Sequence, residues 1–347
     1  MDESPGWAAI DAALARLYGN ETPIHWGTVH RWTLGGPDPL DGISAYPRTE
    51  PVPHWHMVSY GMTELYSKES DNPDESGWGF EFTFRVARAP DEDTPPVWAA
   101  NVLQNLGRYV FNSGNWFEPG HHMNVNGPIR AEDENCLLHA VAFVEDAELG
   151  EIDTPHGRVQ FLQVVGLTAD EYEATRQWDT LGLLGALEPK TPLHVTDIAR
   201  RSLLDDPHVA ATFREGIERD GSSTGLLLIT TAHWTLEPAA TTLRLGALQT
   251  TGIAQALRGR LPYGRDLVLR TDDTSVTFEP SDTFSIREHD GDSLVITLPP
   301  AALNELVAVL RPKAGRHTIP SAPGLVIEIV PTQMRDQYGQ QTGQTIG

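Results

Sequence analysis

The sequence has little cysteine, no long apolar run and no signal-like start, and each absence excludes a class of protein. One cysteine among 347 residues leaves no intramolecular disulfide, so a disulfide scaffold and a cysteine-rich zinc module are both excluded. No apolar segment reaches the ~18–20 residues that a membrane-spanning helix needs. The acidic first residues lack the basic start and apolar core of a secretory signal peptide. We therefore expect a cytoplasmic protein.

Basic residues are also scarce. The 25 Lys and Arg stand against 48 Asp and Glu, which gives a formal net charge of −23, and only three of the basic residues are lysines. Such a surface repels phosphate backbones and anionic lipids, so we expect neither nucleic-acid nor membrane binding. It would instead steer a basic protein toward the surface, although high charge also serves solubility.

Apolar residues are plentiful enough for real cores, at 39% of the chain with nine Trp and ten Phe. Residues spaced three and four apart predict helices, and alternation predicts strands. A capping box of Thr168 and Glu171 marks one further helix start. The predicted helices lie at 7–18, 98–114, from Thr168 onward and 300–312. The clearest predicted strands lie at 55–60, 78–86, 137–146 and 159–167.

The order of these segments predicts two α+β domains. The N-terminal domain spans 1–236, and the pattern changes around residue 237. A smaller domain over 237–334 consists mainly of predicted strands, including the stretch 257–271, with one helix. We expect each domain to be a mixed, mostly antiparallel sheet with packed helices. The Gly- and Gln-rich tail over 335–347 is expected to be disordered.

The strand at 78–86 has one aromatic face and one polar face. Glu81, Thr83 and Arg85 alternate with aromatic residues, which is typical of a half-exposed sheet with its polar side in water. The pair Glu145 and Asp146, which ends a later strand, is interpreted in the same way as a solvated strand end.

Thirteen histidines raise the question of a metal site. His54 and His56 fall on one face of a strand, and His121 or His122 could supply a third zinc ligand if the fold brings them together. Histidines that only form hydrogen bonds at a strand start are commoner, so we expect no metal and no cofactor. A metal-dependent hydrolase remains an alternative. Cys136 is predicted to be a packed thiol, and neither a G-x-S-x-G elbow nor a phosphate loop is present.

Several collinear blocks resemble the Suppressor of fused family. The similar blocks, in chain order, are LGGPDPLDGISAY (34–46), PHWHMVSYGMTELY (53–66), SGWGFEFTFRV (76–86), LGRYVF (106–111), TPHGRVQFLQVVGLT (154–168), QWDTLGLLGAL, HVTDIARRS, ERDGSS, ALRGRLPYGRDLVL (256–269) and SVTF (275–278). The resemblance spans about residues 8 to 331.

This resemblance implies a two-domain, non-enzymatic protein that sequesters a partner between its domains. In animal members the partner is a transcription-factor peptide that adds as a strand between sheet edges. The positions that match the groove are Tyr109, His121 and Glu145 in the first domain. In the second domain they lie on an expected strand near 256–261, at Leu257, Arg258 and Leu261.

The chain departs from the animal pattern in two ways. An acidic residue precedes a histidine in animal members, whereas this chain has His121 followed by His122, which removes a charge complement for the peptide. A long charged insertion of the second domain is also absent, which together with the Arg-over-Lys usage points to a bacterial member. We therefore expect an immunity protein that neutralises a basic toxin. A regulator of a transcription factor is a further alternative, and the oligomeric state stays open.

Overall fold

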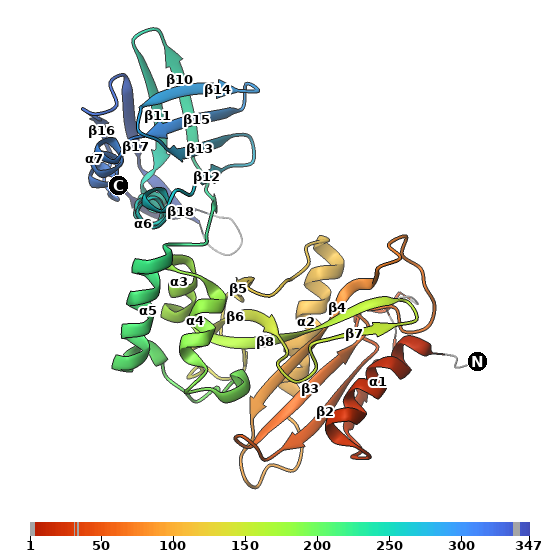
Figure 1. The fold of residues 1–347 in the computed structure, drawn as a ribbon. Helices are drawn as coiled ribbons and strands as arrows, with labels where there is room; N and C mark the ends of the chain where they lie inside the picture. Colours follow the sequence, from red (N-terminus) through yellow and green to blue (C-terminus); the bar gives the residue numbers. More distant parts are fainter. Residues whose placement is uncertain (1–3, 31, 33–34, 336–340) are drawn as a thin grey trace. The chain divides into compact units, whose positions relative to one another are not determined.

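The computed structural model describes residues 4–30, 32, 35–335 and 341–347, and it separates into two compact units (Figure 1). Unit 1 comprises the residues up to Thr175 together with Thr180–Thr212, and unit 2 comprises Arg176–Asp179 and Phe213–Gly347. Both units combine helices with mixed sheets, so the predicted α+β class is confirmed. Within the described ranges, no helix combines the length and the apolar character needed to cross a membrane.

Unit 1 is built on one eight-stranded mixed sheet with the order β1-β2-β3-β4-β8-β6-β5, in which β7 also pairs with β8. Its strands are β1 Ile24–Gly27, β2 Gly42–Arg48, β3 His54–Tyr60, β4 Glu75–Ala87, β5 His122–Asn124, β6 Leu138–Glu145, β7 Glu151–Thr154 and β8 Gly157–Thr168. The helices of this part of the chain are α1 Pro5–Tyr18, α2 Val97–Ser113, α3 Ala169–Gln177, α4 Thr180–Leu187 and α5 Pro207–Asp220, with short 3₁₀ helices η2 Pro192–His194 and η3 Leu203–Asp205. Every strand and helix predicted for 7–18, 55–60, 78–86, 98–114, 137–146 and 159–167 is present.

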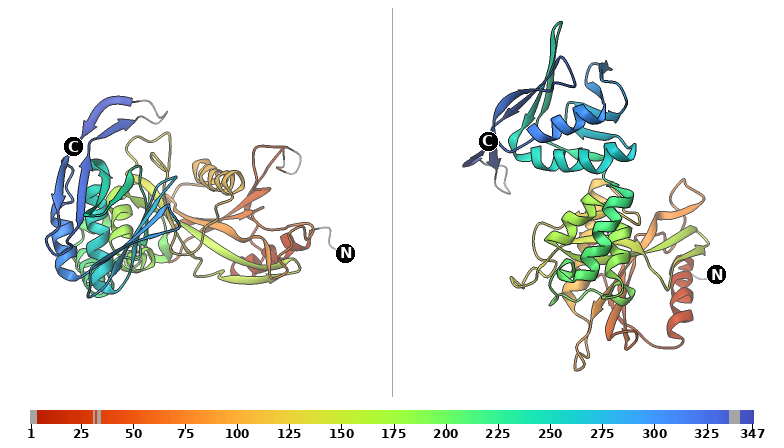
Figure 2. Two further views of the ribbon diagram at one scale, coloured as in Figure 1. Left: turned by 90° about the horizontal axis from the view of Figure 1, so that it is seen from above. Right: turned by 60° about the vertical axis from the view of Figure 1, so that its left-hand side comes forward.

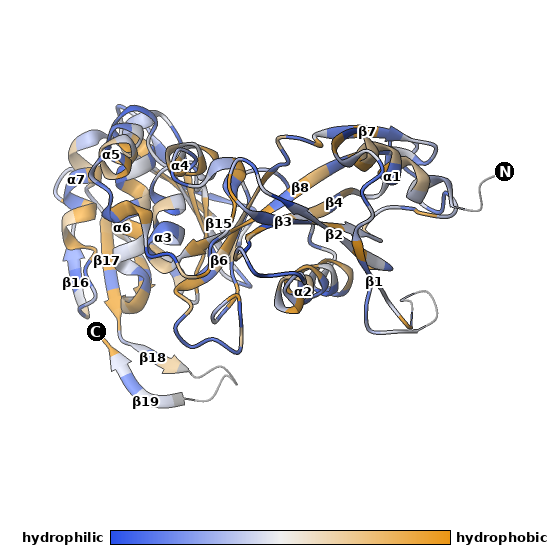
Figure 3. Cartoon of the chain, turned by 90° about the horizontal axis from the view of Figure 1, so that it is seen from below, coloured by the Kyte–Doolittle hydropathy of each residue, from blue (hydrophilic) through white to orange (hydrophobic). Residues whose placement is uncertain are grey.

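Helices α1 and α2 cover opposite faces of this sheet (Figure 3). The α2 side holds the aromatic face of β4, with Phe82 and Phe84 fully buried. The α1 side holds a smaller core that includes Leu14 and Tyr60. One half of the capping box at the start of α3 forms, because Glu171 accepts a hydrogen bond from the Thr168 amide at 3.0 Å, while the Thr168 hydroxyl donates to Asp170 at 2.6 Å.

The polar face of β4 is buried, so the prediction of a half-exposed strand is wrong. Glu81, Thr83 and Arg85 are each 0% exposed. The interpretation of Glu145 and Asp146 as a solvated strand end is also wrong for Asp146, which is 0% exposed while Glu145 is exposed. Alternation indicates only which residues share a face of a strand, and not whether that face is exposed. Here the polar face of β4 is buried against other polar residues of the protein.

Unit 2 contains two principal sheets rather than the single sheet expected for this domain. Their orders are β10-β11-β17-β16 and β14-β15-β13-β12-β9. The strands are β9 Leu226–Leu228, β10 Ala232–Glu237, β11 Ala240–Gly246, β12 Leu267–Arg270, β13 Ser275–Pro280, β14 Ser285–His289, β15 Ser293–Leu298, β16 Gly315–Thr318 and β17 Leu325–Val330, followed by the hairpin of β18 Thr332–Arg335 and β19 Gln341–Ile346. The helices are α6 Thr250–Arg260 and α7 Pro300–Val309, with 3₁₀ helices η4 Ala247–Gln249 and η5 Leu261–Tyr263.

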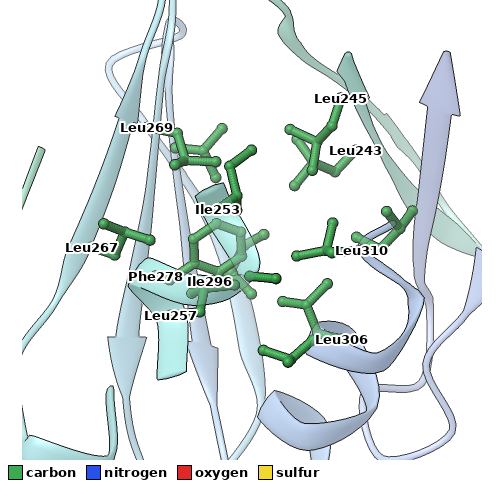
Figure 4. Packing of buried hydrophobic residues seen from close by; sticks show 14 of the residues in the cluster. Leu243, Leu245, Ile253, Leu257, Leu267, Leu269, Phe278, Ile296, Leu306 and Leu310 are labelled. Carbon is green, nitrogen blue, oxygen red and sulfur yellow. The ribbon is translucent and has the colours of Figure 1, made fainter. Parts of the chain in front are cut away.

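The helices α6 and α7 lie side by side in unit 2 (Figure 2), and their apolar side chains meet those of both sheets (Figure 4). The strand expected near 256–261 is therefore wrong, since this segment is the end of α6 followed by η5. Ile253, Leu257 and Leu261 recur at the helical spacing of four and are all buried. Gly252 and Gly259, which are poor helix formers, obscured this pattern.

The predicted domain boundary at 236 and 237 falls within a paired hairpin, because Glu237 of β10 pairs with Ala240 of β11. The boundary between the compact units lies at residues 212 and 213, inside α5. The expected disorder of the tail is wrong for Gln341–Ile346, which forms β19, whereas residues 336–340 lie outside the described residues.

Candidate functional site

The three positions predicted in the first domain gather around the segment 114–121, which we call the Trp116 loop. This loop connects the end of α2 to β5. Gly114 adopts a left-handed conformation with φ 73° and closes α2 through its amide, which donates to the Val110 carbonyl at 2.9 Å. At the other end, the Gly120 amide donates to the Phe143 carbonyl on β6 at 2.8 Å. The loop is therefore fixed at both ends.

Aromatic side chains anchor the Trp116 loop on the sheet. Phe117 is buried and stacks on Phe143, with ring centroids 4.1 Å apart. Tyr109, on α2, stacks on the other side of this anchor at 5.5 Å and remains 38% exposed. The side chain of Trp116 is 55% exposed, which is unusual for the largest apolar side chain. A rigid backbone thus presents one exposed indole and one exposed phenol ring.

A carboxylate accepts a hydrogen bond from this exposed indole. Trp116 Nε1–H donates to Glu118 at 3.1 Å, and the Glu118 amide donates to Nδ1 of His121 at 3.2 Å. The proton of a neutral His121 ring then lies on Nε2, which makes that atom a donor. Glu145 accepts a hydrogen bond from Gln160 at 3.3 Å. Tyr109 thus lies near the end of α2, His121 at the end of the loop and Glu145 at the end of β6, and their role in partner binding stays a prediction.

A pocket of about 370 Å³ opens beside this loop, and we call it the Trp116 pocket. Its walls include Glu75, Trp78, Phe80, Trp116, Glu118 and Gln160. Apolar rings with two carboxylates and no basic side chain in the lining suit a basic or amphipathic group. Glu75 is partly engaged, since Arg158 and Asn72 donate to its carboxylate at 3.4 and 3.2 Å. Glu118 is therefore the carboxylate better placed to meet a ligand.

The strand β5 begins directly after the Trp116 loop and ends the sheet. It pairs with β6 on one side only, with His122 opposite Ala142 and Asn124 opposite Ala140. An edge strand presents backbone donors and acceptors that can pair with an added strand. An extended peptide that pairs with β5 and continues along the Trp116 loop would bring a side chain toward the Trp116 pocket.

The positions predicted in the second domain do not form such an edge. Leu257 is 0% exposed and lies in the core of unit 2 (Figure 4). Leu261 is 4% exposed and belongs to the same core. Arg258 is exposed, but it lies on the helix α6. One of the edge strands of unit 2 is β9, where Leu226 and Leu228 are 46% and 76% exposed. We therefore assign no partner contact to Leu257 and Leu261.

The buried polar face of β4 forms an ion-pair network around Arg85. The Arg85 guanidinium donates to both oxygens of Asp146, at 2.5 and 3.0 Å. Thr83 Oγ1–H and His56 Nε2–H reach the same carboxylate at 2.7 and 3.2 Å. A further Arg85 bond goes to Gln163 at 2.5 Å. We call these five residues the Arg85 network.

Electrostatics fix the charge states in this network. Burial raises the pKa of Asp146, but hydrogen bonds from His56 and the charge and hydrogen bonds of Arg85 outweigh it and hold that pKa well below its ordinary range. Burial and the Arg85 charge lower the pKa of His56, so the ring is neutral and its Nδ1 accepts from the Tyr18 hydroxyl at 2.5 Å. Asp146 is permanently ionised and accepts bonds at both oxygens, while Arg85 bonds through both of its terminal nitrogens but not through Nε. This pair holds strands together and offers no proton for chemistry.

The histidines of the hydrolase alternative are not assembled into one site. His56 is committed to the Arg85 network, and burial lowers the pKa of His54 to about 4. His121 and His122 lie on the Trp116 loop and β5, where His122 Nδ1 bonds Thr180 Oγ1 at 3.0 Å. Among the residues that the structure describes, no three His, Cys, Asp or Glu side chains are grouped to hold a metal ion. Cys136 is buried, as predicted for a packed thiol.

Sequence reasoning missed Trp116 and Glu118. Both stand in NSGNWFEPGHH, where a tryptophan falls among Gly, Asn and Pro residues that predict a loop. An aromatic residue in a turn-rich segment is a signal for a binding residue, because loops carry function and seldom bury large side chains.

The fold and the pocket define an α+β protein whose mixed sheet ends in an accessible strand beside an acidic, aromatic pocket. Comparison with known proteins then gives the family. The Suppressor of fused protein (SUFU) family model matches residues 36–201. The human Suppressor of fused homolog is 35% identical over 237 residues, which cover 63% of this chain and 48% of the human protein. The mouse homolog matches to the same extent. The chain thus spans about half the length of the curated relatives it matches.

Solved structures agree with this assignment. The crystal structure of Drosophila Suppressor of Fused aligns with a TM-score of 0.81 at 22% identity, covering 94% of this chain and 97% of that chain, which shows the fold. The crystal structure of the Sufu-Fu complex aligns with a TM-score of 0.57 at 31% identity, covering 60% of this chain and 97% of that chain. This chain belongs to the Suppressor of fused family.

Proposed function

We propose that this protein is a non-enzymatic binding module that captures an extended segment of a basic partner protein. The Trp116 pocket beside the edge strand β5 is the observation that carries the proposal. Backbone pairing along β5 would supply affinity, and the pocket would select one side chain of the added strand. The related structure of the Sufu-Fu complex supports a protein partner for this fold.

Charge gives the partner its chemical class. The chain carries a formal net charge of −23, and both ionisable groups in the pocket lining are carboxylates. Glu118 lies three residues before His121, so it supplies a negative charge close to the position where the family pattern has its acid. We therefore place Lys or Arg of the partner against Glu118 and the Trp116 ring, where a cation–π contact adds to the ion pair.

A selection of peptides tests this proposal. A random peptide library displayed on phage is selected on the full chain, and the enriched peptides are synthesised and titrated against variants. We expect basic, extended sequences, with affinity lowered at least tenfold by Trp116→Ala and by Glu118→Gln. Val97→Ala, which removes another exposed apolar side chain at the start of α2, should leave affinity unchanged. Acidic or apolar peptides that bind all variants equally would contradict the proposal.

We further propose that the natural partner is a basic toxin, which the acidic surface would attract at long range. The test is co-expression with each protein encoded beside this one whose expression alone stops growth. Growth should be restored by the wild-type chain and not by the Trp116→Ala, Glu118→Gln double variant. Growth arrest that the wild-type chain never relieves would overturn the toxin assignment and leave the peptide-binding proposal to its own test.

A further inference from the structure

A second pocket lies at the end of the unit 1 sheet that is remote from β5, and it takes no part in the proposed function. We call it the α1 pocket. It occupies about 280 Å³ between α1 and the strands β1 and β2, which stand at the opposite end of the strand order from β5. This volume is near the lower limit for small-molecule sites, so it suits a compact head group.

Aromatic rings form the walls of the α1 pocket. Trp7 and Tyr18 come from α1, and Tyr46 comes from β2. Tyr18 and Tyr46 stack with centroids 3.9 Å apart, and Trp7 stacks on Tyr60 at 4.4 Å. Each wall is therefore braced by a second ring, and the rings hold their positions before any ligand arrives. Faces of aromatic rings carry negative charge and attract cations.

Two carboxylates stand at the rim of this pocket. Asp11 accepts a hydrogen bond from the Tyr60 hydroxyl at 2.9 Å, which fixes its direction. No described residue donates a side-chain hydrogen bond to the Glu21 carboxylate, although it lines the same pocket. Burial, and then the charges of Asp11 and Glu21, raise the pKa of Tyr46. The negative charges of Asp11 and Glu21 therefore both act on Tyr46, which forms the β2 side of the pocket.

The basic side chain in the lining does not neutralise these charges. His25 Nδ1 is bonded to Ser44 Oγ at 3.0 Å, and burial lowers its pKa, against an opposing effect of Asp11. The imidazole is therefore neutral near neutral pH, and the lining carries two negative charges. An anion would be repelled, and a neutral apolar group would bury the carboxylates without a partner. A bare metal ion would find few ligand oxygens among aromatic walls.

We propose that the α1 pocket binds an alkylammonium group. Its methyl or methylene groups contact the rings of Trp7 and Tyr46, and its charge faces Asp11 and Glu21. The group can come from a small quaternary amine or from a lysine side chain of another protein, because both present the same chemistry. This binding does not depend on the Trp116 pocket, so either site can be lost without the other.

Calorimetric titration of the full chain with choline tests the proposal, using 3,3-dimethyl-1-butanol as its uncharged isostere and Nα-acetyl-lysine amide as the protein-derived probe. A cation–π contact and two solvent-screened carboxylates are together worth about tenfold or more in affinity, so choline should bind at least about tenfold more tightly than the isostere. The tighter of choline and the lysine probe identifies the source of the ammonium.

Variants distinguish the contribution of the two carboxylates to binding from the contribution of the aromatic walls. Asp11→Asn with Glu21→Gln should weaken choline binding about tenfold and leave the isostere unchanged, because the amide of Asn can still accept from Tyr60. Trp7→Leu should weaken both probes. The matched control is Asp91→Asn with Asp93→Asn, which removes two exposed carboxylates of the same unit. Equal affinity for choline and the isostere, absence of binding by both choline and the lysine probe, or unchanged affinity for the ammonium probe in the folded double variant would each overturn the proposal.

Discussion

At the residue scale, the carboxylate of Asp146, which directly follows β6, bonds to two other strands and to a turn. It receives hydrogen bonds from His56 on β3 and from Arg85 on β4, while the amides of Glu148 and Leu149 close the turn on it at 3.0 Å each. A buried ion pair of this kind is weak evidence for stability in itself, but removal of one partner leaves the other charge buried and unpaired.

We therefore expect Asp146→Ala to destabilise the protein by about 3–5 kcal/mol, because Arg85 would stay buried with only the partly exposed Glu148, at 2.9 Å, as a counter-ion. The control is Glu145→Ala, which removes the preceding, exposed carboxylate and should change the free energy of unfolding by no more than about 0.5 kcal/mol. Urea unfolding followed by tryptophan fluorescence measures both. Similar unfolding midpoints for the two variants would contradict the role assigned to Asp146.

Glu81 gives the protein a predicted pH dependence. Its carboxylate is fully buried and accepts bonds from Ser59, from the Gly61 amide and from Thr63. Burial raises its pKa from 4.5 to about 7, against the lowering effect of these donors. The folded state then binds a proton that the unfolded state releases between these values. Stability from this group is full below about pH 4.5 and is lost as the pH rises to about 7.

Glu81→Gln should remove this dependence, because the amide mimics the protonated carboxyl. Between pH 5 and pH 8, wild type should lose up to about 3 kcal/mol of unfolding free energy relative to the variant. Urea unfolding of both proteins at the two pH values gives the comparison, in which contributions from other groups cancel. A difference that is the same at both pH values would show that Glu81 is ionised throughout.

At the scale of the element, a glycine decides how α5 packs. A Cβ at Gly216 would lie 2.2 Å from the Trp178 ring, and Trp178 is itself held by its Nε1–H bond to Asp220 at 2.9 Å. Gly185 on α4 is the opposite case, since nothing lies within 4 Å of a Cβ built there.

Alanine at these two positions should therefore act in opposite directions. Gly185→Ala should stabilise the protein by about 0.5–1 kcal/mol, the usual gain for a helical glycine. Gly216→Ala should instead destabilise it by about 1–3 kcal/mol, because the methyl group displaces the indole. Thermal unfolding of both variants checks the signs. A stabilising Gly216→Ala would show that Trp178 does not pack on α5 in this way.

An element could be predicted from the sequence where the residues that determine it lie close together in the chain. Strands β3 and β4 and helix α2 carry strong periodicity, and their position was predicted from it. The helix α6 was missed because its buried residues are interrupted by glycines, and tertiary packing restores what propensity lacks. The burial of Asp146 could not be predicted, since its partner Arg85 is 61 residues away in sequence. The sequence alone does not distinguish a buried carboxylate from an exposed one. The Trp116 pocket arises only when β4, β8 and the loop meet.

At the scale of the whole molecule, the excess of 23 negative charges should control association with any basic partner. Attraction between surface charges is screened beyond about 10 Å at 0.1 M salt. We expect the association rate of a selected basic peptide to fall at least severalfold between 20 and 300 mM salt, with a smaller change in the dissociation rate. Stopped-flow kinetics measure both rates. A salt-independent association rate would show that the acidic surface serves solubility alone.

Pairing of the partner segment with β5 is the central claim for this Suppressor of fused family member, and hydrogen exchange tests it most directly. Backbone exchange is measured by mass spectrometry on the full chain, with and without a saturating basic peptide from the library selection. We expect exchange to slow over residues 114–126, which contain the Trp116 loop and β5, and to stay unchanged over the opposite edge strand β1. Tight binding without any protection in 114–126 would contradict the claim.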